Sequence, residues 1–133
     1  MSMTMPAGQY YVGDLCYVMH DAWTEVCDLM FPSAAETFGM ADGVMTLKDG
    51  RKFAVFSTAY GDGVYGDQYG HDYPVDAGSI GCIRVEDIKD ATADLGLGAI
   101  IDFEQDFDVY SDGENLTFGH IVIPTGAEDY DEE

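Results

Sequence analysis

The chain has 133 residues, of which 47% are hydrophobic and 13% aromatic, and 26 acidic residues against 5 basic ones give a formal net charge of −21. A chain of this length and hydrophobic content buries the core of one domain, so the composition excludes a wholly disordered protein. The charge repels phosphates and anionic lipids, which excludes direct binding of nucleic acid or of a membrane surface. A net negative charge of this size instead implies a basic partner, a bound cation or a high-salt habitat.

The ends of the chain and its cysteines favour a cytoplasmic protein. Residues 1–8 lack the charged and apolar regions of a secretory signal, and no stretch reaches the roughly 18 apolar residues of a membrane span. The three cysteines are widely separated and form no C-x-x-C pair, which favours buried thiols over a disulfide framework or a zinc site. We expect one globular domain over residues 1–125, an acidic flexible tail over residues 126–133, and no cofactor.

The first elements in chain order are short strands followed by one helix. Residues 9–12 and 16–19 are strand-like around a Gly-Asp turn. Residues 21–31 carry apolar side chains at the i, i+3, i+4, i+7, i+8 spacing of one buried helical stripe. Asp21 caps this predicted helix and Pro32 ends it. The outer face of the helix is acidic: Asp21, Glu25 and Asp28.

Two β-hairpins follow in the prediction. Residues 44–48 and 51–56 are joined by Asp-Gly, the dipeptide favoured in type I′ turns, and residues 100–111 and 114–123 are joined by another Asp-Gly. Strands over residues 73–76 and 79–85 and a short turn or helix over residues 85–91 lie between them. The predicted fold class is α+β, a mostly antiparallel β-sheet (sandwich or half-barrel) with one packed amphipathic helix.

The clearest pattern is an acidic ladder in a C-terminal region, residues 91–133, that contains no Lys or Arg. Acidic residues occupy every second position from Asp102 to Asp108, so one strand face would be carboxylate and the other buried. A solvated sheet face that protects a strand edge is the ordinary explanation. The alternative is a surface that binds a basic partner, to which we assign Asp102, Glu104, Asp106, Asp108, Asp112 and Glu114, together with Asp21, Glu25 and Asp28 of the helix.

Two other kinds of site are weaker. The Gly-rich loop over residues 59–72 carries oxygen ligands of the type that Ca²⁺ accepts, but their spacing is not that of an EF-hand, and Asp and Gly are ordinary turn residues. The candidate metal ligands are Asp62, Asp67, Asp72 and Asp76. A thiol–imidazole pair would draw on Cys16 or Cys82 and on His20, His71 or His120. Dense negative charge disfavours a thiolate and no catalytic motif is present, so we predict a protein that is not an enzyme.

Four segments carry a family resemblance: residues 10–18 (YYVGDLCYV), 59–65 (AYGDGVY), 73–81 (YPVDAGSIG) and 118–123 (FGHIVI). In this order they resemble a family of small, acidic, uncharacterised proteins of bacteriophages and bacteria, over about residues 10–124. Leu15 stands where that family often has Pro, so the first turn is expected to differ. The resemblance implies no activity and no catalytic residues, but a phage origin favours an inhibitor of host machinery.

The sequence therefore predicts a non-enzymatic acidic inhibitor that mimics nucleic acid. Its expected partner is a basic nucleic-acid-binding host protein, as for an anti-CRISPR or anti-restriction protein. The alternatives are a Ca²⁺-binding β-domain, and a halophile-adapted domain whose acidic residues say nothing of its function.

Overall fold

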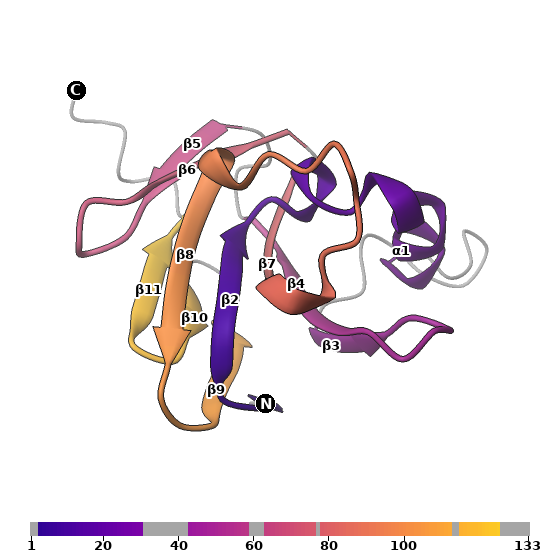
Figure 1. Cartoon of the computed structure of the whole chain (residues 1–133). Helices are drawn as coiled ribbons and strands as arrows, with labels where there is room; N and C mark the ends of the chain where they lie inside the picture. The colour runs from indigo at the N-terminus through magenta and orange to yellow at the C-terminus, as the bar shows by residue number, and fades with distance from the viewer. Residues whose placement is uncertain (1–2, 31–42, 59–62, 77, 113–114, 126–133) are drawn as a thin grey trace.

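The computed structural model describes residues 3–30, 43–58, 63–76, 78–112 and 115–125, which form eleven strands and one α-helix. All strand pairs are antiparallel, which confirms the predicted α+β class (Figure 1). A four-stranded sheet has the order β1 (Met3–Met5), β9 (Phe107–Ser111), β10 (Asn115–Phe118), β11 (Ile121–Pro124). A five-stranded sheet has the order β3 (Gly43–Thr46), β4 (Lys52–Ser57), β7 (Ser79–Arg84), β2 (Gly8–Gly13), β8 (Gly98–Phe103). A separate hairpin consists of β5 (Gly63–Gly66) and β6 (Asp72–Val75).

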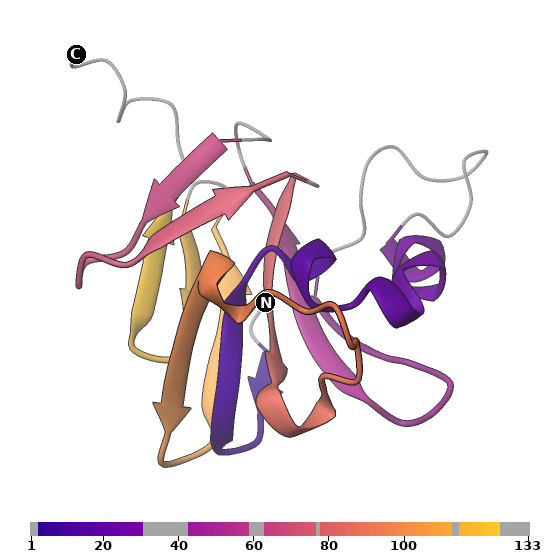
Figure 2. The same ribbon diagram turned by 45° about the horizontal axis from the view of Figure 1, so that its top comes forward.

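The main core lies between the two large sheets. Tyr10 and Val12 of β2 and Phe118 of β10 are among its fully buried side chains. The β5–β6 hairpin lies across one side of this core, with β6 against β8 and β5 against β11 (Figure 2). It contributes Tyr65 and Tyr73 to the core. The hairpin therefore covers the gap between edges of the two sheets.

A second core covers the outer face of the five-stranded sheet. Helix α1 (Trp23–Met30) follows a 3₁₀ turn (His20–Ala22), and its Val26 is fully buried against this face. Other 3₁₀ turns lie at Leu15–Tyr17, Val85–Asp87 and Leu95–Leu97. Because both faces of the sheet are covered, β7 is buried at nearly every position.

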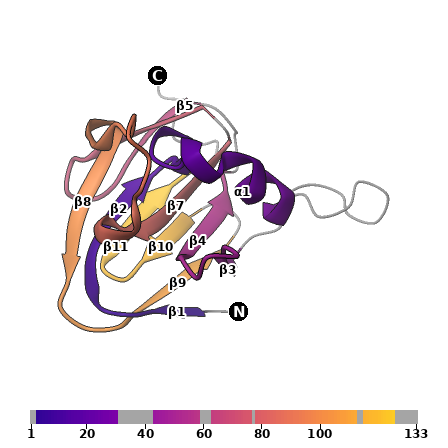
Figure 3. The same ribbon diagram turned by 45° about the vertical axis from the view of Figure 1, so that its right-hand side comes forward.

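A bent two-stranded ribbon joins the two sheets: β1 and β2 run along β9 and β8 (Figure 3). Met5 pairs with Phe107 on one side of the bend, and Gly8 pairs with Phe103 on the other. Residues 104–106 therefore oppose only two residues of the partner strand, which is a one-residue bulge. A bulge bends the strand that contains it, and here it carries the ribbon from one sheet into the other.

Several predicted elements are wrong in detail. The predicted strand over residues 100–111 is two strands in different sheets, because the bulge interrupts it. The predicted strand over residues 114–123 is β10 and β11, which turn back at Gly119, where φ is +62°. Residues 16–19 do not form a strand, since a 3₁₀ turn begins at Leu15. Strands β1 and β5 were not predicted.

Some predictions fall on residues outside the described ranges, namely Phe31 and Pro32 at the predicted helix end and the tail over residues 126–133. Within the described ranges, no helix has the length and apolar character needed to cross a membrane.

Candidate functional site

Four acidic side chains gather on the bend between β8 and β9, and we call Asp102, Glu104, Asp106 and Asp108 the acidic corner. All four residues are exposed. The apolar side chains that alternate with them are buried in the core: Ile101, Phe103, Phe107 and Val109. The predicted alternation is thus confirmed, except that Gln105, expected on the buried face, is exposed at the bend.

Three of the corner carboxylates accept hydrogen bonds from the N-terminal ribbon strand. These bonds hold β1 and β2 against the bend, and they leave each carboxylate with a second oxygen that remains at the surface. The donors are the Thr4 hydroxyl to Asp108 (3.2 Å), the Ala7 backbone N–H to Asp106 (3.0 Å) and the Gln9 amide to Asp102 (3.1 Å). Glu104 differs from the other three, because it has no hydrogen-bond partner among the residues that the structure describes.

No cation compensates the corner. In the ion pairs formed between described residues, none of the four corner acids takes part. Arg51 instead binds Asp21 (3.0 Å) and Asp49 (2.9 Å), and Lys89 lies 3.9 Å from Asp49. Arg84, which donates to the Ala7 carbonyl (2.8 Å), pairs with Glu86 (3.6 Å). Among the described residues, the ion pairs of Arg51, Arg84 and Lys89 thus all go to acidic residues outside the corner.

The acidic residues predicted on the helix do not extend the acidic corner. Asp21 is not the helix cap that was predicted, because it lies within the 3₁₀ turn that precedes α1. Asp21 is the partner of Arg51, and the Glu25 carboxylate accepts the backbone N–H of Lys48 at 2.6 Å. With Asp28 they line a groove between α1 and the β3–β4 hairpin, which also contains both of these basic residues. In Figures 1 and 2, α1 lies on the right and β8 on the left. The predicted binding residues thus fall into two groups rather than one continuous surface.

Asp112, another predicted binding residue, lies between β9 and β10. Asp112 is exposed and accepts the backbone N–H of Asn115 at 2.7 Å, so its carboxylate closes the turn. Glu114 lies outside the described residues.

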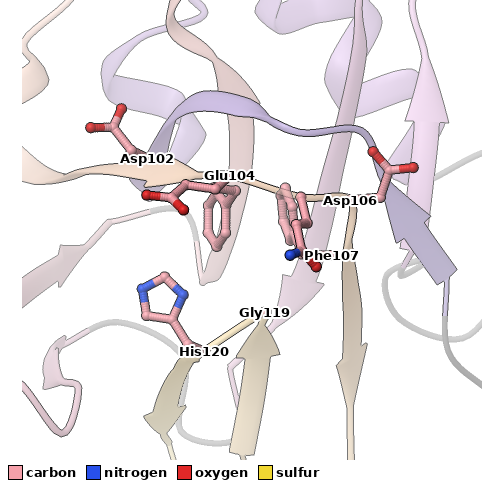
Figure 4. A pocket seen from close by; sticks show the side chains of 8 residues that line it. Asp102, Glu104, Asp106, Phe107, Gly119 and His120 are labelled. Atoms are coloured by element: carbon pink, nitrogen blue, oxygen red, sulfur yellow. The ribbon is translucent and has the colours of Figure 1, made fainter.

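A pocket of about 370 Å³ opens at the acidic corner. Residues 102–107 form one side, and Gly119 and His120 of the β10–β11 turn form the other (Figure 4). The rings of Phe103 and Phe107 stack with their centroids 3.7 Å apart and line the pocket. Phe103 is only 5% and Phe107 only 6% exposed, whereas His120 is an exposed residue. The corner thus combines carboxylates with an aromatic wall whose accessible part is the His120 ring and small parts of the two Phe rings.

Gly119 keeps this pocket open. Its φ of +62° is a conformation that other residues rarely adopt. A Cβ atom at this position would lie 2.9 Å from the Phe103 ring and 3.1 Å from the Cβ of Phe107. A larger residue would therefore press on the stacked rings as well as strain the turn.

A glutamine side chain fixes the other wall. The Gln68 amide, at the tip of the β5–β6 hairpin, donates to the backbone carbonyl of His120 (2.7 Å) and accepts the N–H of Val122 (3.0 Å). The Gln68 side chain thus bonds backbone groups beside β11 that a neighbouring strand would otherwise bond. The ring of Tyr69 also packs near His120, with centroids 6.0 Å apart.

In its described part, residues 63–72, the Gly-rich loop does not bring predicted calcium ligands together. The side chain of Asp67 has no exposed surface, and its oxygens accept hydrogen bonds from within the loop. Asp72 and Asp76 are exposed, and Asp62 lies outside the described residues. Over the described parts of the chain, no three His, Cys, Asp or Glu residues come together as a metal site.

The candidate thiol–imidazole pairs are also not assembled. Cys82 is fully buried in the core between the sheets, and this burial raises the pKa of its thiol. Cys16 is half-buried beside the first 3₁₀ turn. His20 hydrogen bonds with Thr92 (3.0 Å), and His71 with Asp67 (2.6 Å). A buried thiol with a raised pKa is a poor nucleophile.

Sequence reasoning missed the pocket. Gln68, Gly119 and His120 reach the corner from turns that are distant in sequence, and no local pattern connects them with residues 102–107. The one available signal was Gln105, a polar residue at a position that a continuous strand would bury.

Comparison with protein-family models, with curated proteins and with solved structures finds no match for this chain. The function is therefore argued from the acidic corner alone.

Proposed function

We propose that this chain is a non-enzymatic acidic inhibitor that occupies the basic, nucleic-acid-binding surface of another protein, as an anti-restriction or anti-CRISPR protein of a phage does. The observation that carries the proposal is the segregation of charge. The acidic corner has no ion-pair partner among the described residues, whereas Arg51 and Lys89 are paired with acidic residues elsewhere.

An unbalanced group of carboxylates attracts a surface rich in Lys and Arg and accelerates its association. Same-face side chains of a strand lie roughly 6.6 Å apart, whereas DNA presents one phosphate per about 3.4 Å on each strand. The corner therefore imitates the charge of nucleic acid and not the geometry of a duplex.

The test is displacement of a fluorescent DNA duplex from purified bacterial proteins, measured by fluorescence anisotropy. The panel comprises a restriction endonuclease, a CRISPR effector, a repair protein and an RNA polymerase. We expect the chain to displace DNA from at least one of them, with an association rate that falls by about tenfold or more between low and high salt.

Two charge-matched variants locate the effect. The corner variant carries D102N, E104Q, D106N and D108N, and the control variant carries D28N, D72N, D76N and E86Q at exposed positions elsewhere. We expect displacement to be lost in the corner variant and kept in the control. Equal loss in both would contradict a site at the corner, and displacement that is insensitive to salt would contradict the mechanism.

A further inference from the structure

The corner pocket differs from the rest of the acidic surface in having an aromatic wall. In Figure 4 the carboxylates of Asp102 and Glu104 lie on the His120 side of the opening, and that of Asp106 lies at the far side. The ring of Phe107, on which that of Phe103 stacks, stands between them.

The carboxylates at this opening make few hydrogen bonds to other described residues of the chain. Asp102 accepts one hydrogen bond, from Gln9, and Glu104 accepts none from the described residues. The carbonyl of His120 is bound to Gln68, so the turn that carries the imidazole is fixed in place. The His120 ring lies 5.4 Å from that of Phe103, which continues the aromatic wall toward the surface.

These features suit one kind of side chain. A guanidinium group is planar, bonds carboxylates through several N–H groups in fixed geometry and stacks on aromatic rings, while an ammonium group is a compact and strongly hydrated charge. A phosphate or carboxylate ligand would be repelled by Asp102 and Glu104. The pocket volume of about 370 Å³ is at the lower end for small-ligand sites, so it holds a single side chain and not a folded segment.

We infer that the corner pocket receives an arginine side chain of the basic partner, with its guanidinium group between the carboxylates of Asp102 and Glu104 and against the aromatic wall. This inference rests on the proposed function and adds the type of residue of the partner that the pocket would hold. The surrounding corner acids attract the partner at a distance, and the pocket selects arginine over lysine at contact.

The experiment compares octa-arginine with octa-lysine, two probes of equal charge, by calorimetric titration of the full chain. We expect the wild type to bind octa-arginine about three- to fivefold more tightly than octa-lysine at the same ionic strength. E104Q should reduce this ratio to about one. D108N removes the same charge from the corner outside the pocket lining, so it should weaken both peptides equally and keep the ratio.

A second measurement uses N-acetyl-arginine amide and the lysine analogue, followed by proton NMR. We expect the arginine compound to shift the ring resonances of His120 and Phe103, and the lysine compound to leave them unchanged. Equal affinities of the wild type for the two peptides, or a preference that survives E104Q, would overturn the arginine pocket and leave the proposed function standing. Failure of both peptides to bind would overturn the proposed function as well.

Discussion

The buried carboxylate of Asp67 organises the β5–β6 hairpin tip that carries the Gln68 contact. It accepts the backbone N–H groups of Tyr69 (2.8 Å) and His71 (3.0 Å), the Nδ1 of His71 (2.6 Å) and the hydroxyl of Tyr73 (2.7 Å). Burial alone would raise the pKa of Asp67, but the hydrogen bonds from Tyr73, His71 and the backbone outweigh it and hold the pKa below its ordinary value.

Tyr73→Phe tests one contact of this group, the hydrogen bond from the Tyr73 hydroxyl to Asp67. Tyr73 is fully buried, and the variant removes a hydrogen bond to a charged acceptor, which is worth about 1.5–3 kcal/mol. We expect the free energy of unfolding to fall by about 2 kcal/mol. Asp67→Asn keeps an oxygen for the backbone donors but places an amide N–H₂ toward Tyr73. It should therefore lower the free energy of unfolding by at least as much as Tyr73→Phe. Because both variants break the same contact, their effects on stability should not be additive.

The assay is urea unfolding of both single variants and the double variant, followed by far-ultraviolet circular dichroism. Tyr69→Phe is the matched control: Tyr69 lies in the same hairpin with 59% exposure, so its loss of a hydroxyl should change the stability by less than about 0.5 kcal/mol. The reasoning fails if Tyr73→Phe is as stable as the control, or if the double variant loses the plain sum of the two single losses.

Three further outcomes can be measured. Because the pKa of Asp67 is lowered in the folded state, its stabilisation is present above pH of about 4 and is lost in stronger acid, so urea midpoints of wild type and Asp67→Asn should converge as the pH falls below that value. Gln68→Glu keeps an acceptor for Val122 but turns an oxygen toward the His120 carbonyl; we expect the free energy of unfolding to fall by about 0.5–1.5 kcal/mol and amide exchange at Val122 to become faster, and unchanged exchange would contradict this. The Cys82 thiol should react with an aromatic disulfide reagent only as the chain unfolds, as mass spectrometry of the labelled peptide can check; rapid labelling of the native chain would refute its burial.

Local patterns predicted the fold class and failed at the bend. Alternation of apolar and acidic residues from Asp102 to Asp108 correctly separated exposed from buried side chains, except at Gln105, which is exposed. The same alternation gives no information on whether a strand stays in one sheet. Phe103 and Phe107 are four positions apart, so a single continuous strand and two strands joined by a bend predict the same buried face for both. The Asp49-Gly50 pair correctly marked the β3–β4 hairpin. It is not the expected type I′ turn, because Asp49 does not have a positive φ and Leu47 pairs with Arg51. The turn at Gly119 was not predicted.

The candidate site depended on contacts that a single sequence does not reveal. In the sequence, the acidic residues predicted on the helix are as negative as those of the ladder. In the fold, Asp21 forms an ion pair with Arg51, whereas the corner acids form no ion pair with the described residues. Which carboxylate is paired is decided by tertiary packing, so charge counts alone predict a negative protein and not the location of its unpaired charge.

The hydrogen bonds from β1 and β2 to the corner couple the N-terminus of the chain to whatever the corner binds. A cation that draws Asp106 away from Ala7 weakens the pairing of β1, and by thermodynamic reciprocity a loosened β1 changes the affinity for that cation equally. The short strand β1 is thus able to report occupancy of the corner, and substitutions at Thr4 or Gln9 can tune binding without touching an acidic residue.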